Sequence, residues 1–473
     1  MPPAWLLPGA VLALLAGCAQ PGPSHTPLAL TTPAQVGLAP EDAGQAAPAP
    51  LAATLLPPTP EAAGLGDAAL TALMREALAG QPSLAAARAR LARAQAAAGL
   101  SQASHGPQVQ LSVDATRQHY TANGMIPPPV AGNTYNSGTV QVGASWAPDF
   151  FGQHAAELAA AVGQARAAEA EQVAAAQLLL AQMARAEVNL ARLLAQQDLL
   201  ARSATLRQQA LALVRQRHNA GLDTQADVAQ AEVALKDLAT QQAALAEQVA
   251  AVRLQLASLA GQPARVMDDH APRLSALRLA PLPAQLPADL LGRRPDLVAA
   301  RWRVEAATQD VKGARAQFYP NLNLTAFIGL NALGLDQVLQ GDSRQWGVSP
   351  ALRLPLFDGG RLRAQLGGRQ AEADAAIAQY NGQVLEAVRE ARDALVSLLA
   401  LEQQQVQAQG VAESLGRAQD LAGQRQAAGL GGRLPVLQAE LQALAQQRLL
   451  LDLQARKLDA GVLLHRALGG GWS

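Results

Sequence analysis

The feature that most constrains this 473-residue chain is an internal duplication, which preserves both the order and the spacing of its motifs. The repeated pairs are PSLAAARAR at 82–90 and PDLVAARWR at 295–303, HGPQVQL at 105–111 and FYPNLNL at 318–324, and AGL at 220–222 and 428–430. Because self-similarity of this kind indicates one structural unit repeated along the chain, the sequence predicts two copies of the same fold.

The copies are predicted at residues 61–270 and 287–470, with a linker over 271–286. An apolar stretch at 1–17 is predicted to be an export signal, since it is too short to span a bilayer as a stable helix and ends in small residues. Residues 18–60 are rich in Pro, Ala and Thr and cannot bury enough apolar surface to fold. They are predicted to be an extended tether.

Within each copy the hydrophobic period changes in a fixed order. A helix is expected first, over 83–105 and again over 296–317. Two strands should follow it, and the four predicted strands are 107–118, 138–148, 320–331 and 345–356. A long helical hairpin should then complete each copy, over about 153–260 and 360–468, because the first helix of each hairpin contains no proline. Apolar rows such as Leu190, Leu193 and Leu200 are expected where these helices pack together.

The predicted strands alternate between apolar and polar side chains. Val109, Leu111 and Val113 share one face of the first strand, and Leu322, Leu324, Ala326 and Ile328 share one face of the third. Strands of about ten residues with this alternation are typical of a membrane-spanning β-hairpin. The same alternation also fits a sheet that covers a soluble core, and periodicity alone does not separate the two.

If the strands enter a membrane, one chain is not enough. The smallest membrane barrels have about eight strands, and an open edge leaves backbone groups unpaired in lipid. Two chains would make a barrel of about eight strands, filled by side chains, whereas three would make one of about twelve, with room for a lumen.

Cys18, the single cysteine, closes the apolar stretch as Leu15-Ala16-Gly17-Cys18. This arrangement resembles the lipobox of bacterial lipoproteins, which implies a mature chain that begins at Cys18 with lipid on its thiol and amine. Ala19 follows, and by the usual sorting rule it favours the outer membrane. An ordinary signal peptide with an incidental cysteine is the alternative.

The composition excludes several classes of function. The 37 basic and 37 acidic side chains cancel, so no basic surface favours nucleic acid. One cysteine forms neither an internal disulfide nor a thiolate metal site, and the seven histidines lack zinc-ligand spacing. No convergent cluster of polar residues predicts an enzyme. We therefore expect no catalytic residue, no metal and no cofactor other than the lipid on Cys18.

Four longer motifs carry a resemblance to a known family. They are GRRPDLVAA at 292–300, ARAQFYPNLNLT at 314–325, LPLFDGGRLRA at 354–364 and RALGGG at 466–471. Over about residues 61–470 the chain resembles the outer-membrane factors of TolC type. Within that family it looks most like the NodT-type efflux lipoproteins of tripartite pumps, of the RND or fusaric-acid type.

The resemblance implies an α+β membrane protein with a duplicated arrangement of helix, β-hairpin and long helical hairpin. It further implies a homotrimer in which a twelve-stranded outer-membrane β-barrel continues into a periplasmic α-helical barrel. Such a channel conducts drugs or other small molecules passively, and its partners are a periplasmic adaptor and an inner-membrane transporter.

The glycine turns at the ends of the long helices are the candidate functional sites. Gly221, Leu222, Gly429 and Leu430 are expected to contact the adaptor, a role that is compatible with capping the helix ends. The resemblance also implies a periplasmic gate, often closed by aspartates after the second turn, where this chain has Pro435 and Gln438 instead.

Asp227, six residues after Gly221, is the remaining candidate for a ring of carboxylates, with Arg217 or Arg433 as partners. The alternative role of Asp227 is that of an acid at a helix N-terminus.

Two other classes of protein share part of this pattern. A trimeric periplasmic coiled-coil lipoprotein would explain the helices and Cys18 but leaves the strands without a role. A periplasmic adaptor has an export signal and a helical hairpin, but it has one hairpin and no duplicated amphipathic strands.

Overall fold

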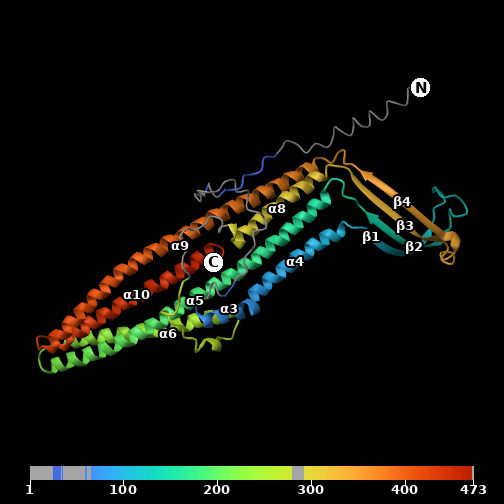
Figure 1. Cartoon of the computed structure of the whole chain (residues 1–473). Coiled ribbons are helices and arrows are strands. Elements are labelled where there is room, and N and C mark those ends of the chain that lie inside the picture. The colour runs from blue at the N-terminus through green and yellow to red at the C-terminus, as the bar shows by residue number, and fades with distance from the viewer. Residues whose placement is uncertain (1–24, 33–34, 36–58, 61–64, 280–291, 471–473) are drawn as a thin grey trace. The chain divides into compact units, whose positions relative to one another are not determined.

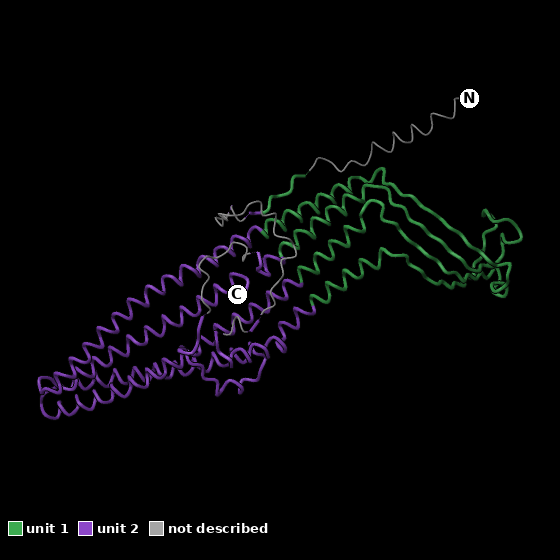
Figure 2. Tube along the Cα trace, in the orientation of Figure 1, with its two compact units in different colours: residues 1–30, 90–168, 300–380 green, residues 31–89, 169–299, 381–473 purple. Residues whose placement is uncertain are grey.

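The computed structural model describes residues 25–32, 35, 59–60, 65–279 and 292–470 (Figure 1). The predicted export signal, Cys18, most of the tether, the second half of the predicted linker and the first residues of the second copy lie outside this part of the chain. The described residues divide into two compact units, shown in Figure 2. Unit 1 comprises 1–30, 90–168 and 300–380, and unit 2 comprises 31–89, 169–299 and 381–473.

The first copy of the repeat contains five elements in the predicted order. They are α4 (Pro82–Ser104), β1 (Gln108–His119), β2 (Thr134–Trp146), α5 (Gln153–Asn219) and α6 (Gln225–Ala260). The second copy has the same elements in the same order. They are α8 (Pro295–Ala316), β3 (Asn321–Leu333), β4 (Arg344–Arg353), α9 (Arg361–Ala427) and α10 (Arg433–Ala467). Helices α5 and α9 each contain 67 residues, as expected for segments without proline.

The sheet lies in unit 1 and has the order β1-β2-β3-β4, with every neighbouring pair antiparallel. Two of the short helical turns in the described residues are η2 (Ala264–Met267) and η3 (Gly341–Ser343). The base of unit 1 is held by a small core in which Ala314 and Phe318 pack against Leu362 and Leu366.

The ends of the return strands differ from the prediction. Strand β4 ends at Arg353, so Leu354 and Leu356, which we expected within it, lie beyond its end. Pro355, two residues beyond this end, has no backbone N–H to donate, although Pro350 is accommodated within β4 opposite Leu324. Strand β2 begins at Thr134, four residues before the predicted start at 138. Its pairing with His119 of β1 extends the first hairpin toward the loop.

One helix was not anticipated from the sequence. Helix α3 (Ala68–Gly80) precedes α4, and the Asp67 carboxylate caps it by accepting hydrogen bonds from the N–H groups of Ala69 and Leu70. Its fully buried side chains Leu70 and Met74 belong to the main core of unit 2. Because this helix is short, its apolar positions did not stand out as a period.

The core of unit 2 forms where α5, α6 and α10 meet α3 and the segment 262–279. Leu190 and Leu193 of α5 are 0% and 1% exposed, and Leu200 is also buried, as predicted for the apolar row. Leu274 and Leu277, which fall in the predicted linker, are buried in the same core. The backbone N–H of Arg278 donates to the carbonyl of Leu65 at 2.8 Å. This start of the linker is therefore part of the folded core.

Candidate functional site

The two predicted turns have the same backbone structure. Gly221 and Gly429 follow the long helices with φ values of 75° and 72°, in the left-handed region that favours glycine. The next residue in each turn donates its N–H back to the helix, Leu222 to Arg217 and Leu430 to Arg425, both at 2.9 Å. This is the hydrogen-bonding pattern of a glycine C-cap. The side chains of Leu222 and Leu430 are 68% and 80% exposed, so each turn presents a leucine to its surroundings.

Asp227 lies in the first turn of α6, where it forms a capping box with Thr224. Its carboxylate accepts hydrogen bonds from the Thr224 hydroxyl at 2.6 Å and the Thr224 N–H at 2.7 Å. These bonds stabilise the charged form and lower the pKa of Asp227 below its usual value. Within one chain, the helix-capping role that we considered for Asp227 is therefore present.

The two arginines proposed as partners pair with other acids inside the chain. The Arg217 guanidinium donates two hydrogen bonds of 2.9 Å to the carboxylate of Asp223. This pairing raises the pKa of Arg217. Arg433 forms an ion pair with Glu440 at 3.2 Å, about two turns further along α10. Of the two predicted partners of Asp227, Arg217 lies beside the first turn, near Asp223 and Asp227. Arg433 lies on the second hairpin and pairs there with Glu440.

The second turn is built differently from the first. Gly432 is the N-cap of α10 and has no side chain to accept a hydrogen bond from the helix. Pro435 falls in the first turn of α10, where its missing N–H would have no partner in the helix. The two turns of the duplicated chain therefore share a backbone geometry but not a chemistry.

The sheet of unit 1 carries one continuous apolar face. The pairing registers place Leu111, Val142, Ile328 and Trp346 in one row across all four strands, and Val109, Ala144, Ala326 and Val348 in the next. Ile328 is 67% exposed and Trp346 is 77% exposed, and Leu111 and Val348 are similarly exposed. No described residue covers these side chains, which contradicts the alternative in which the sheet covers a soluble core within the chain.

The opposite face of the sheet is polar. The Asn331 amide donates to the Thr139 hydroxyl at 2.8 Å, and the Gln345 amide donates to the Gln141 side chain at 3.1 Å. The first of these bonds joins neighbouring strands, and the second links β4 to β2 across Gly329 of β3. The sheet therefore has one polar face and one apolar face.

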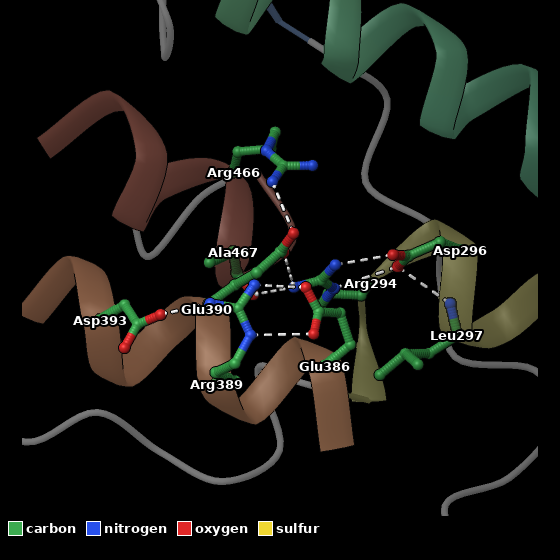
Figure 3. Close-up of polar contacts among 9 residues, drawn as sticks. All are labelled: Arg294, Asp296, Leu297, Glu386, Arg389, Glu390, Asp393, Arg466 and Ala467. Atoms are coloured by element: carbon green, nitrogen blue, oxygen red, sulfur yellow. Dashed lines mark hydrogen bonds and ion pairs between the residues drawn. The ribbon is translucent and has the colours of Figure 1, made fainter. Parts of the chain in front are cut away.

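A buried arginine in the GRRPD motif forms ion pairs at the start of the second repeat (Figure 3). Arg294 is 5% exposed and its guanidinium pairs with Asp296 at 2.7 Å and with Glu390 of α9 at 2.9 Å. Arg466 of α10 also pairs with Glu390, at 3.0 Å. The sequence contained the motif but gave no sign of these partners, which come from three separate helices. The network joins the start of α8 to α9 and to the C-terminal end of α10.

Within residues 65–279 and 292–470, no group of three or more His, Cys, Asp or Glu side chains is arranged to hold a metal ion. No helix in the described part of the chain combines the length and the hydropathy that crossing a lipid bilayer requires.

Comparison with known proteins adds independent findings. The family model for outer membrane efflux proteins matches residues 73–262 and 286–470. The multidrug resistance outer membrane protein MdtP of Shigella flexneri is 34% identical over 419 residues, covering 86% of this chain and 85% of that protein.

Solved structures give the same result. The outer membrane protein VceC of Vibrio cholerae is 34% identical, with a TM-score of 0.80 over 88% of this chain and 100% of that one. The outer-membrane channel OprN is 27% identical, with a TM-score of 0.78 over 86% of this chain and 91% of that one. Relatives of this kind are transport proteins rather than enzymes.

The matched residues include most of the first predicted copy, the whole of the second, both glycine turns and the four strands of the sheet. These findings confirm the resemblance that the motifs indicated, the efflux function and the location in the outer membrane. The chain belongs to the outer membrane efflux protein family and is an outer-membrane channel component of an efflux system.

Proposed function

We propose that the chain works as a homotrimer that conducts exported molecules passively through the outer membrane and part of the periplasm. The observation that carries this proposal is the sheet, which has four strands, an exposed apolar face and no strand pairing at β1 or β4 beyond the described neighbours. An apolar face is stable against lipid, and unpaired edges require a partner there. Three copies would place β4 of each beside β1 of the next, closing a barrel of about twelve strands.

The helices would continue the path on the periplasmic side. Helices α5 and α9 each pair with a shorter return helix, α6 and α10, and each hairpin ends in a glycine turn. Three chains would supply enough helices to surround a water-filled duct. No described side chain needs to perform chemistry, because the energy for export would come from the transporter.

The partners would be a periplasmic adaptor and an inner-membrane transporter, forming a tripartite pump. The glycine turns are the proposed adaptor contacts, because the exposed Leu222 and Leu430 offer apolar surface at the ends of the hairpins. The relative MdtP is named a multidrug resistance protein. We propose by analogy that drugs or other small molecules pass through this channel.

Lipid on Cys18 would anchor the mature chain to the outer membrane. Cys18 lies outside the described residues, so the support is the sequence Leu15-Ala16-Gly17-Cys18.

Three Asp227 carboxylates would converge near the periplasmic mouth and contribute to a gate, with Arg217 as the nearest basic partner. The capping box and the gate are compatible, since a carboxylate that caps its own helix keeps its charge.

A trimeric coiled-coil lipoprotein or an adaptor with a structural role is the other candidate. Neither gives a role to an exposed apolar face of four strands. The test is the migration of detergent-extracted outer membranes on a denaturing gel, with and without boiling. A closed barrel trimer resists unfolding until it is boiled, so a band at trimer mass in the unheated lane is expected. Monomer in both lanes, together with no ion conductance in planar bilayers, would contradict the channel.

A further inference from the structure

A polar cavity of about 390 Å³ lies among helices α5, α6 and α10 of unit 2. Its polar lining includes Arg185, Asn189 and Arg192 of α5, Gln255 of α6, and Arg456 and Asp459 of α10. The α5 residues are three or four positions apart, so they form one stripe along the helix. None of these residues was singled out by the sequence, because they come together only when the helices pack.

The face of the helices on which the cavity opens can be inferred from residues that stand two positions before or after its lining residues. Glu187 of α5 bonds to His270 at 2.8 Å. Arg253 of α6 donates to the backbone carbonyl of His270, and Gln454 of α10 donates to that of Leu274. All three thus face the segment 262–279.

A step of two residues turns an α-helix by about 200°. Arg185 and Asn189, Gln255 and Arg456 each stand two positions from those three residues. They therefore lie on the opposite face of the same helices. One face of the helical layer is covered by the segment 262–279, and the cavity opens on the other. In a ring of helices around a duct, the uncovered face is the inner one.

The charges of the cavity do not cancel. Arg185 pairs with Asp459 at 2.6 Å, and Arg192 pairs with Asp452 at 3.1 Å. Arg456 is exposed and makes no ion pair or hydrogen bond with the residues that the structure describes. Each cavity therefore carries one excess positive charge, beside amide groups that donate further hydrogen bonds.

Part of the cavity lining is apolar. Ala186, Val188 and Ala455 contribute to its lining and are all buried. A guanidinium with free N–H groups recognises a carboxylate, and an adjoining apolar surface accommodates a hydrocarbon body. A single excess charge matches a monoanion better than a polyphosphate, which requires several cations.

We propose that this cavity is a binding site for small organic carboxylates, encountered by exported molecules on their way through the duct. Its place on the inner face rests on the proposed function, whereas its ability to bind a carboxylate does not. Arg456 would receive the carboxylate, Arg192 and Asn189 would add hydrogen bonds, and the site would recur three times around the axis of a trimer.

The test is a ligand-observed NMR titration of the purified full-length protein with hexanoate and with hexanamide, its neutral analogue, in low-chloride buffer. We expect hexanoate to bind at millimolar concentrations and hexanamide to bind much more weakly. Arg456→Gln should weaken hexanoate binding roughly tenfold, since it removes a hydrogen bond to a charged group. Arg448→Gln, an exposed arginine of α10 outside the cavity lining, should change nothing.

A second variant protects the test against a folding defect in the first. Asp459→Asn leaves Arg185 without its acid and should tighten hexanoate binding severalfold. Equal binding of hexanoate and hexanamide, equal losses in the Arg456 and Arg448 variants, or no hexanoate binding to wild type would overturn the site. Wild-type trimers that conduct K⁺ in planar bilayers but do not bind hexanoate would refute the site alone. Absence of K⁺ conductance would refute the proposed channel.

Discussion

Replacing Ile328 by arginine tests the assignment of the sheet to the membrane. Ile328 is one residue past the middle of β3 (Asn321–Leu333), is 67% exposed, and pairs with Val142 on one side and Trp346 on the other. If the apolar face meets lipid, this position lies near the bilayer midplane. Arginine at the midplane of a membrane barrel costs about 2–4 kcal/mol.

The cost is multiplied by the symmetry of the assembly. Three copies of Ile328→Arg would destabilise a trimer by roughly 6–12 kcal/mol, three times the cost for a single site. Most natural proteins have a free energy of unfolding of about 5–15 kcal/mol. We therefore expect heat-resistant trimer to be largely lost from outer-membrane fractions, as measured by unheated gel migration and by urea titration of protein folded into lipid vesicles.

Thr325→Arg is the matched control, because Thr325 is exposed, lies three positions earlier on the same strand and points to the polar face. It introduces the same charge into water rather than lipid, so trimer should persist. Equal loss of trimer from the two variants would refute the assignment of the apolar face to lipid.

Three further predictions concern other parts of the chain. The hydrogen bond to Glu187 raises the pKa of His270 above 6.5, so the stabilisation from this pair is complete below that pH and is lost as the pH rises through the folded-state pKa. The protection factors of amides in the segment 262–279, which are corrected for the intrinsic rise of exchange with pH, should therefore fall in alkaline buffer. An equal fall of these protection factors in a His270→Gln variant would contradict this. Asp227→Ala should raise the single-channel conductance of the trimer if the carboxylates contribute to a gate. Thr224→Ala, which weakens the cap but keeps the acid, should lower the free energy of unfolding by about 1 kcal/mol without that effect. Cys18→Ser should abolish labelling of the protein by palmitate while the trimer still assembles. Incorporation of palmitate into the Cys18→Ser variant would disprove the assignment of the lipid to Cys18.

The regular elements were predictable because their signals are local. The long helices α5 and α9 are recognised by the absence of proline, and strands β1 and β3 by their alternation of apolar and polar residues. Both signals can be read from residues that are close together in the sequence. The ends were less accurate, as the end of β4 at Arg353 shows. The duplication also fixed the order of the elements, since each copy supported the interpretation of the other.

The polar sites were not predictable for the opposite reason. Glu187 is fully buried, yet its partner His270 is 83 positions away in the chain. Arg185 and Asp459 are separated by 274 positions. Neither pair leaves a pattern in the sequence, because the contact of Glu187 with His270 is set by how the segment 262–279 packs on α5, and that of Arg185 with Asp459 by how helices from both copies pack. Asp227 was assigned two roles from its position alone, and only the capping role could be decided from one chain.

The exposed apolar face also has a consequence for how the protein reaches its membrane. Before assembly, each newly exported chain passes through an aqueous compartment. During that passage its sheet is apolar on one side and unpaired at both edges. Such a sheet is a template for aggregation. If the chain assembles as the proposed trimer, that assembly depends steeply on concentration, so dilution favours the vulnerable monomer. We expect that biogenesis requires a holding chaperone that shields the row around Ile328, and that the chaperone leaves when lipid takes its place.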